Sequence, residues 1–169
     1  FSKKNSFNKA TNFATLSLLF VTVLIFFDFS TNFALFDSFF SNTQFTKFFK
    51  ILTTLGAAIS LIISKNYFID SKINKFEIPT LLLFSTLGML IMISSKNLMI
   101  MYLAIELQSL SLYVVASIKR NSIESAESGV KYFILGALSS GILLYGFSLV
   151  YGFTGHTSFE GISISLSEI

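Results

Sequence analysis

Residues 98–118 read L-M-I-M-Y-L-A-I-E-L-Q-S-L-S-L-Y-V-V-A-S-I, an apolar stretch whose one charged side chain is Glu106. At 1.5 Å per residue, a helix of this length reaches about 31 Å, which matches the hydrocarbon thickness of a bilayer. The stretch is therefore predicted to be a transmembrane helix. Its carboxylate is predicted to lie near the middle of the membrane.

The composition of the whole chain supports the same interpretation. Of its 169 residues, 53% are hydrophobic and 12% are charged, whereas a soluble domain has roughly 25% charged residues. The mean hydropathy is +0.72. A soluble globule of this length cannot bury so much apolar surface, which excludes soluble enzymes and secreted domains. The lysines lie in short clusters between apolar runs, so the net charge of +3 does not indicate nucleic acid as a partner.

Four further stretches are long and apolar enough to cross the membrane. The predicted spans are residues 12–29, 45–64, 78–95, 98–118 and 126–152, all within one membrane domain, residues 1–169. Pro79, preceded by Glu77, suits the first turn of the third helix. Residues 33–44 are predicted to be an interfacial connection. The alternation of polar and apolar residues in 158–169 predicts a short extended or interfacial segment outside the membrane. The predicted fold is an all-α polytopic transmembrane helix bundle.

The basic residues predict the orientation of the bundle. With the N-terminus inside, eight of the twelve lie on the inner side, while Lys47, Lys50 and Lys96 lie on the outer side. This excess predicts an N-terminus on the cytoplasm-equivalent side, which is the matrix in a mitochondrion. Eleven Lys against one Arg, with abundant Phe, Ile and Asn, is typical of A+T-rich organellar genes. This composition is only a hint of a mitochondrial origin, whereas the apolar runs predict a multi-pass membrane protein. A place in the mitochondrial inner membrane is what the family resemblance described below implies.

Glu106 is the first of two ionisable residues within the predicted spans. A lone carboxylate at the bilayer centre costs on the order of 2.5–3.5 kcal/mol. Helical spacing places Tyr102, Ser109 and Tyr113 on the same face. One interpretation is a protonated carboxyl group that links two helices by hydrogen bonds. The other is a titratable group in a water-lined pathway, which is the usual role of an intramembrane acid.

Lys131 is the second ionisable residue within the spans. It lies about 7.5 Å into the fifth span, so its side chain could reach the interface without any further role. About 10 Å along the membrane normal separates it from Glu106, which argues against a direct ion pair. A coupling through water or a hydroxyl group such as that of Ser139 remains open.

Small residues follow one another along the fifth span and predict close helix packing. They are Gly129, Gly136, Ala137, Ser139, Ser140, Gly141 and Gly146. Cysteine is absent and the single histidine, His156, is given no role. Disulfides, cysteine-ligated iron–sulfur clusters and zinc sites of the usual type are thereby excluded, and no metal site is predicted.

Two stretches carry a resemblance to a known family. Residues 85–120 contain E-L-Q-S-L, and residues 126–155 contain G-V-K-Y-F-I-L-G-A-L-S-S-G and Y-G-F-T-G. They resemble the antiporter-like subunit N of respiratory complex I, called NADH dehydrogenase subunit 2 in mitochondria. The first 76 residues match that family only in hydropathy.

The resemblance implies an antiporter-like fold and specific roles for two residues. Glu106 corresponds to the glutamate of the family's fifth transmembrane helix, and Lys131 to the lysine on its sixth. Both would belong to a proton pathway in which the glutamate pairs with a lysine on the family's seventh helix. This chain stops before that helix. The resemblance therefore implies either that this sequence is a fragment of the subunit or that a second polypeptide carries the rest of it.

The resemblance also implies cofactors and partners. This chain would bind no cofactor, because NADH, FMN, iron–sulfur clusters and ubiquinone lie in other subunits of complex I. Its partners would be other membrane subunits of complex I and lipid. The predicted function is the N-terminal part of a proton-translocating subunit of NADH:ubiquinone oxidoreductase. The alternative is a structural membrane piece with an inert half-channel, retained because its helices pack against neighbours.

Overall fold

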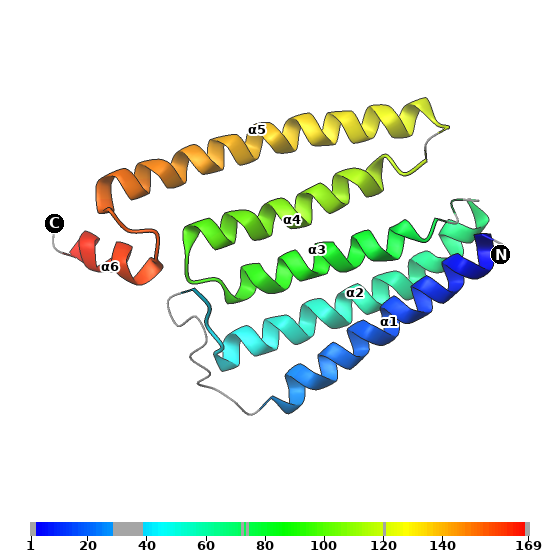
Figure 1. Ribbon diagram of the computed structural model, residues 1–169, viewed down its shortest axis with the longest axis horizontal. Coiled ribbons are helices and arrows are strands. Elements are labelled where there is room, and N and C mark those ends of the chain that lie inside the picture. Colours follow the sequence, from blue (N-terminus) through cyan, green and yellow to red (C-terminus); the bar gives the residue numbers. More distant parts are fainter. Residues whose placement is uncertain (1–2, 29–38, 72, 74, 120, 168–169) are drawn as a thin grey trace.

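The computed structural model describes residues 3–28, 39–71, 73, 75–119 and 121–167. Within these residues the chain is all-α, as predicted, with only two isolated β-bridges between extended segments. Its helices are α1 (Lys3–Phe27), α2 (Gln44–Asp70), α3 (Glu77–Ser94), α4 (Leu98–Ala116), α5 (Ile123–Thr154) and α6 (Phe159–Ser167) (Figure 1).

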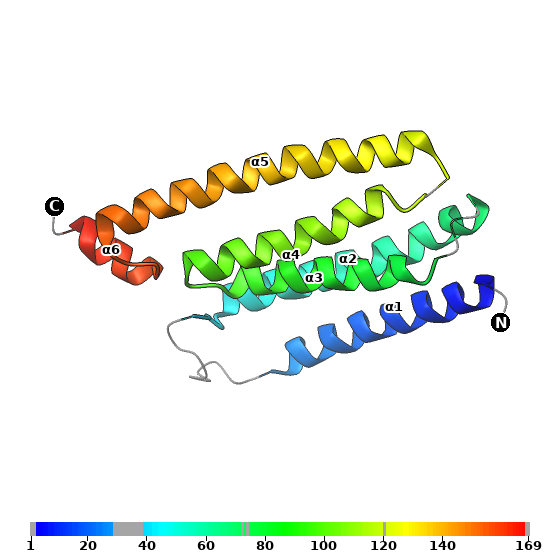
Figure 2. The same cartoon turned by 45° about the horizontal axis from the view of Figure 1, so that its top comes forward.

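The five long helices run antiparallel, and each lies mainly beside its neighbours in chain order (Figures 1 and 2). The N-terminus and the α2–α3 and α4–α5 connections lie at one end of the bundle, here called the N-terminal end. The α3–α4 connection and α6 lie at the opposite end, here called the α6 end. α1 also contacts α3, and the most extensive contact between helices is that of α3 with α4.

Local signals in the sequence set the helix boundaries. α2 begins after Thr43, which exchanges hydrogen bonds with Thr46 in a capping box. The side chains of Asn97 and Ser122 cap α4 and α5 by accepting a backbone N–H of the first turn. α5 ends at Gly155, whose φ of 68° is the left-handed conformation that favours glycine.

All five long helices can cross a membrane by length and composition, which confirms the predicted number of spans. The helices extend beyond the apolar runs: α2 has 27 residues and α5 has 32. At 1.5 Å per residue, α5 is about 48 Å long, against about 30 Å of hydrocarbon. Both ends of α5 therefore reach beyond the apolar layer.

Of the two alternatives for the C-terminal segment, the extended one is wrong, and the interfacial one stays a prediction. Residues Phe159–Ser167 form α6, and the serines donate back to backbone carbonyls, as Ser165 does to Gly161. Alternation over a few residues does not distinguish a strand from a short helix without partners. The predicted interfacial connection over 33–44 lies partly outside the described residues. Phe40 within it forms a β-bridge with Ser95.

The core of the bundle lies where α1 and α2 meet. Ala14 and Leu18 of α1 pack against Ala58 and Leu61 of α2, and α3 contributes partly buried leucines. One turn away, the Thr22 hydroxyl group donates to the buried Thr54 hydroxyl, which in turn donates to a backbone carbonyl. Small residues and satisfied hydroxyl groups let these helices approach closely, as is usual in membrane bundles.

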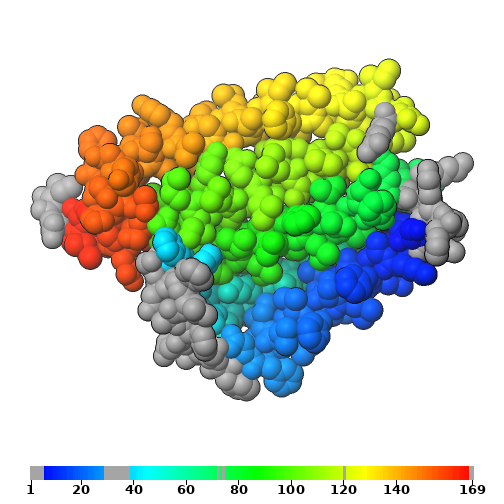
Figure 3. Space-filling model, in the orientation of Figure 1, coloured from blue at the N-terminus to red at the C-terminus, as the bar shows by residue number. Residues whose placement is uncertain are grey.

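The outer surface is apolar on every long helix, which is typical of a lipid-facing bundle. α5 lies along one edge of the molecule (Figure 3). None of the residues in the most apolar stretch of α5 is buried by the rest of the described chain. Phe133, Leu138, Ile142 and Tyr145 are each at least half exposed. This helix has most of its surface free for lipid or for other proteins.

Glycines permit close approach at three places. A Cβ atom at Gly88 would lie 2.7 Å from the Ala104 carbonyl oxygen, so α3 and α4 meet backbone to backbone. Gly129 faces Ser117 and Gly136 faces Tyr113, both on the α4 side. In contrast, a Cβ atom at Gly141 or Gly146 would meet nothing within 4 Å. The predicted close packing of α5 thus holds for its first half only.

Candidate functional site around Glu106

Glu106 lies near the middle of α4. It is eight residues from Leu98, or about 12 Å, and ten from Ala116, or about 15 Å. The residues around it are apolar, and the side chain is half-buried. The helix therefore holds the carboxylate far from either membrane surface.

Glu106 lies on the side of α4 that faces α5. Ala104 marks the opposite side, because its carbonyl lies against Gly88 of α3 and two residues along a helix turn the chain by about 200°. Tyr113, two turns from Glu106 on the same face, packs on Tyr132 and Phe133 of α5 with ring centroids 4.8 and 5.7 Å apart. The carboxylate consequently belongs to the α4–α5 interface.

Within the described part of the chain, the Glu106 carboxylate has no hydrogen bond and no ion pair. The predicted companions Tyr102 and Ser109 are half-buried, and Tyr113 is buried with its hydroxyl group directed at Gly136. None of the three hydrogen bonds to the carboxylate. The site is a carboxylate on an apolar helix without a partner in these residues.

Lys131 is placed away from Glu106. Its ammonium group pairs with Glu127, one turn earlier on α5, and its side chain is 69% exposed. Gly129 of α5 faces Ser117 at the end of α4, and the two helices are antiparallel. Glu106 is eleven residues before Ser117 and Ser140 is eleven residues after Gly129, so Ser140 and Glu106 lie at the same level. Lys131 is nine residues from Ser140, or about 14 Å along the helix. The structure therefore does not join the two predicted site residues.

Ser140 is the hydroxyl residue that the sequence interpretation missed. Gly129, Gly136 and Ser140 are spaced by seven and four residues, so they share the face of α5 that meets α4. Ser140 is half-buried, whereas the predicted Ser139 is exposed. The spacing of these three residues could be seen in the sequence. Only the contact of Gly129 with Ser117 shows that their face of α5, and not another, packs against α4.

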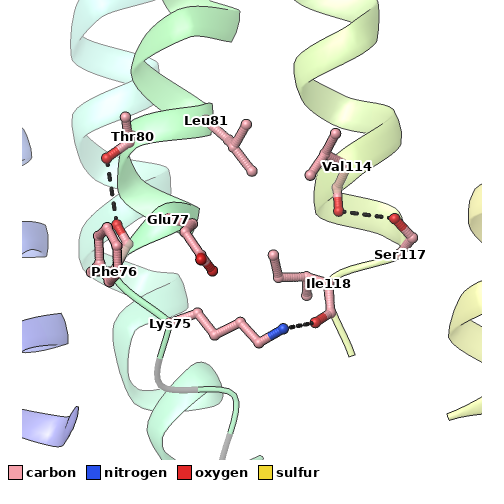
Figure 4. A pocket seen from close by; sticks show the side chains of 8 residues that line it. All are labelled: Lys75, Phe76, Glu77, Thr80, Leu81, Val114, Ser117 and Ile118. Carbon is pink, nitrogen blue, oxygen red and sulfur yellow. Dashed lines mark hydrogen bonds between the residues drawn. The ribbon is translucent and has the colours of Figure 1, made fainter. Parts of the chain in front are cut away.

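A second polar feature lies at the N-terminal end of the α3–α4 pair (Figure 4). A pocket of about 450 Å³ is lined by Lys75, Glu77, Thr80 and Ser117, with apolar side chains between them. The Lys75 ammonium group donates to the Ile118 carbonyl oxygen over 2.6 Å and ties the α2–α3 connection to the end of α4. This pocket begins about 12 Å along α4 from Glu106, at Val114.

An ion pair at the α6 end, between a buried lysine and a partly exposed aspartate, was also missed from the sequence. Lys47, placed on the outer side by the predicted topology, is 9% exposed. Its ammonium nitrogen lies 3.9 Å from a carboxylate oxygen of Asp28 and donates to the backbone carbonyl of the same residue. Lys47 was counted as a surface charge, but it is buried because Asp28, which directly follows α1, lies beside it.

The part of the chain that the structure describes contains no group of three histidine, aspartate or glutamate residues that could hold a metal ion. The polar groups of the membrane interior are instead single ionisable residues and hydroxyl groups. The chemistry that the Glu106 site can perform is the binding and release of a proton.

Comparison with known proteins agrees with this architecture. A family model described as NADH:quinone oxidoreductase/Mrp antiporter, transmembrane, matches residues 95–168, which include α4 and α5. NADH-quinone oxidoreductase subunit N of Pelagibacter ubique is 52% identical over 95% of this chain and 34% of its own length. The same subunit of Bartonella bacilliformis is 47% identical over 90% of this chain and 31% of its own.

Among solved structures, respiratory complex I from Thermus thermophilus with bound aureothin contains a chain with the same fold. The TM-score is 0.75 at 26% identity, over 95% of this chain and 36% of the other. The chain therefore resembles antiporter-like membrane subunits of NADH:quinone oxidoreductases in sequence and in fold. Both relatives named above are subunit N, which confirms the resemblance noted in the sequence. The chain spans about a third of the length of these relatives.

Proposed function

We propose that this chain forms part of a proton-translocating membrane subunit of NADH:ubiquinone oxidoreductase, in which Glu106 takes up and releases a proton. The observation that carries the proposal is a carboxylate at mid-length of a membrane-spanning helix, half-buried against α5. Such a group costs several kcal/mol less when it is protonated or paired than when it is charged and alone. Its charge state therefore responds to any group brought beside it.

Lys131 contributes less directly in this proposal. Its pairing with Glu127 and its position about 14 Å from Ser140 keep its charge away from the carboxylate. The cation that switches Glu106 would then come from a neighbouring helix outside this chain. A second polypeptide bearing the rest of the subunit, together with other membrane subunits of complex I and lipid, would cover the exposed face of α5. NADH, FMN, iron–sulfur clusters and ubiquinone would be bound by other subunits.

The proposed location is the mitochondrial inner membrane with the N-terminus in the matrix. The charge count assigned the N-terminus and the α2–α3 and α4–α5 connections to the same side of the membrane. The arrangement of the helices supports this assignment, because these three segments lie at one end of the bundle. Those segments carry most of the basic residues, which favours the inner side for that end.

The rival function is a structural membrane piece whose carboxylate is inert. Replacing Glu106 with glutamine in the assembled complex distinguishes the two, because glutamine keeps the volume and removes the titratable group. We expect proton translocation coupled to NADH oxidation to fall about tenfold or more, since a positioned proton-transfer group contributes about 10²–10⁴-fold. Proton uptake into inside-out vesicles and NADH oxidation are measured together.

The controls are Glu127→Gln, which removes an exposed carboxylate, and Lys131→Arg, which keeps the charge. Both should leave translocation within about twofold, because neither changes a charge in the middle of the membrane. Glu106→Asp should retain part of the activity. Normal pumping by an assembled Glu106→Gln complex would establish the structural role instead.

A further inference from the structure

The pocket beside Lys50 joins a cation to apolar walls. It has a volume of about 290 Å³ and is built by four segments of the chain. Its lining residues are Ile25 of α1, Phe40, Lys50 of α2, and Leu90, Ile91 and Ser94 of α3. A positive group that opens onto isoleucine and leucine side chains is the arrangement that an amphiphile with an anionic head would fit.

The charges around the pocket leave Lys50 uncompensated. Asp28 attracts the Lys50 ammonium group and Lys47 repels it. Lys47 is the lysine that pairs with Asp28, and Asn42 also donates to the Asp28 carboxylate. The side chain of Lys50 forms no hydrogen bond or ion pair with any residue that the structure describes. Two lysines and one aspartate thus give the cluster a net charge of +1.

The wall of the pocket is held by the backbone. Phe40 lies in a short extended segment that forms a β-bridge with Ser95. The Ser41 N–H donates to the Ser94 carbonyl and the Lys96 N–H to the Phe39 carbonyl, each over 2.7 Å. These bonds fasten the segment before α2 to the end of α3. The ring of Phe40 therefore has a fixed place at the rim.

The depth of Lys50 suits a lipid phosphate. The apolar run of α2 begins near residue 45, so the Lys50 Cα lies five residues, or about 7.5 Å, below the hydrocarbon boundary. Its flexible side chain can extend towards the headgroup layer. Ile25, Leu90 and Ile91 continue the pocket towards the acyl chains.

We propose that this pocket binds an anionic phospholipid, with its phosphate on the Lys50 ammonium group and an acyl chain along the apolar wall. The site is separate from Glu106 and does not depend on the proposed proton chemistry. A free phosphate would meet the same cation but would gain nothing from the apolar wall. An acidic side chain of a neighbouring subunit is the other possible occupant, and the experiment separates these outcomes.

The chain has no tryptophan, which allows a single reporter. Phe40→Trp places the reporter at the pocket rim. Tyr145→Trp places the control on the exposed face of α5, at a residue that does not line the pocket. The full chain is reconstituted in phosphatidylcholine bilayers that contain phosphatidylglycerol with brominated acyl chains, and then in bilayers with the bromine on phosphatidylcholine. Quenching of tryptophan fluorescence gives the relative affinity for the two lipids.

We expect the Phe40→Trp reporter to show about a fivefold preference for phosphatidylglycerol, as one lysine near an anionic lipid provides, and the Tyr145→Trp control to show almost none. Lys50→Met should abolish the preference at the rim, whereas Lys50→Arg should retain it. Excess inorganic phosphate should not compete with phosphatidylglycerol for the pocket. Sulfate at equal ionic strength is the control for the effect of salt. Competition by inorganic phosphate would assign the site to free phosphate. A rim reporter without preference, or a preference that survives Lys50→Met, would overturn the lipid site and leave a partner's carboxylate as the counter-charge.

Discussion

The α3–α4 pair and the second half of α5 have similar sequences but different surroundings. Both contain glycine among large apolar residues. At Gly88 a Cβ atom would lie 2.7 and 2.9 Å from backbone atoms of α4, whereas at Gly141 it would meet nothing within 4 Å. The α3–α4 interface is complete within this chain, while the second half of α5 exposes Ser139, Gly141 and Ser148.

The difference shows that small residues on a helix allow another helix to approach closely, but they do not show whether such a helix is present in this chain. Without a hydrophobic driving force between helices in lipid, close packing needs both surfaces. The first half of α5 finds its second surface in Tyr113 of α4 and in Ser117, which follows that helix. Glu106 lies on the α4 face level with Ser140, where this matched packing gives way to the unmatched half of α5.

Gly88→Ala is expected to have the largest effect on the stability of the chain. The added methyl group would overlap the Ala104 carbonyl and the Gln108 N–H, which are backbone atoms that cannot rotate away. Overpacking of this kind costs about 1–3 kcal/mol, and we expect the upper end of that range. Unfolding of the full chain in detergent, followed by circular dichroism, measures the loss. Gly56→Ala is the matched control, because a Cβ atom there meets nothing within 4 Å. An equal loss in both variants would show that the α3–α4 contact is not specific.

Gly136→Ala is expected to have an intermediate effect. Its methyl group would overlap the Tyr113 hydroxyl group, which is the far end of a side chain and can move. We expect a loss of about 1 kcal/mol. In the same unfolding assay, Tyr113→Leu should restore part of this loss, because it removes the hydroxyl oxygen and also the two ring carbons that would lie within 3 Å of the added methyl group. A double variant as unstable as Gly136→Ala alone would place the strain elsewhere.

Gly141→Leu is expected to have the smallest effect on the chain by itself. Nothing lies near a Cβ atom at this position, and leucine is a better helix former than glycine by about 0.8–1 kcal/mol. The unfolding of the isolated chain should therefore be unchanged or slightly more resistant. Assembly into the membrane complex, measured by native gel electrophoresis, should fall if another protein packs on this half of α5. Full assembly would show that lipid covers it.

The sequence predicted the elements and could not predict their contacts. Five apolar runs of membrane length are local features, so the number of long helices follows from them. The caps Thr43, Asn97, Ser122 and Gly155 are local features too, but they were identified only in the structure. The C-terminal alternation misled, because α6 is too short for its period to be decisive. The depth of Glu106 could be counted along its helix, since the rise per residue is fixed.

The pairing of charges depended on the tertiary structure. Lys131 pairs with Glu127 on its own helix, and Lys47 is buried against Asp28. Which charges pair depends on how each helix is rotated about its axis and shifted along it. The bilayer does not fix this rotation or shift, because lipid tails and leucine side chains are equally apolar. The sequence by itself therefore determined that the chain crosses a membrane five times and holds a carboxylate at mid-depth. Only the packing of α4 on α3 and α5 decided which side of the helix that carboxylate faces, and that it has no partner among the residues described.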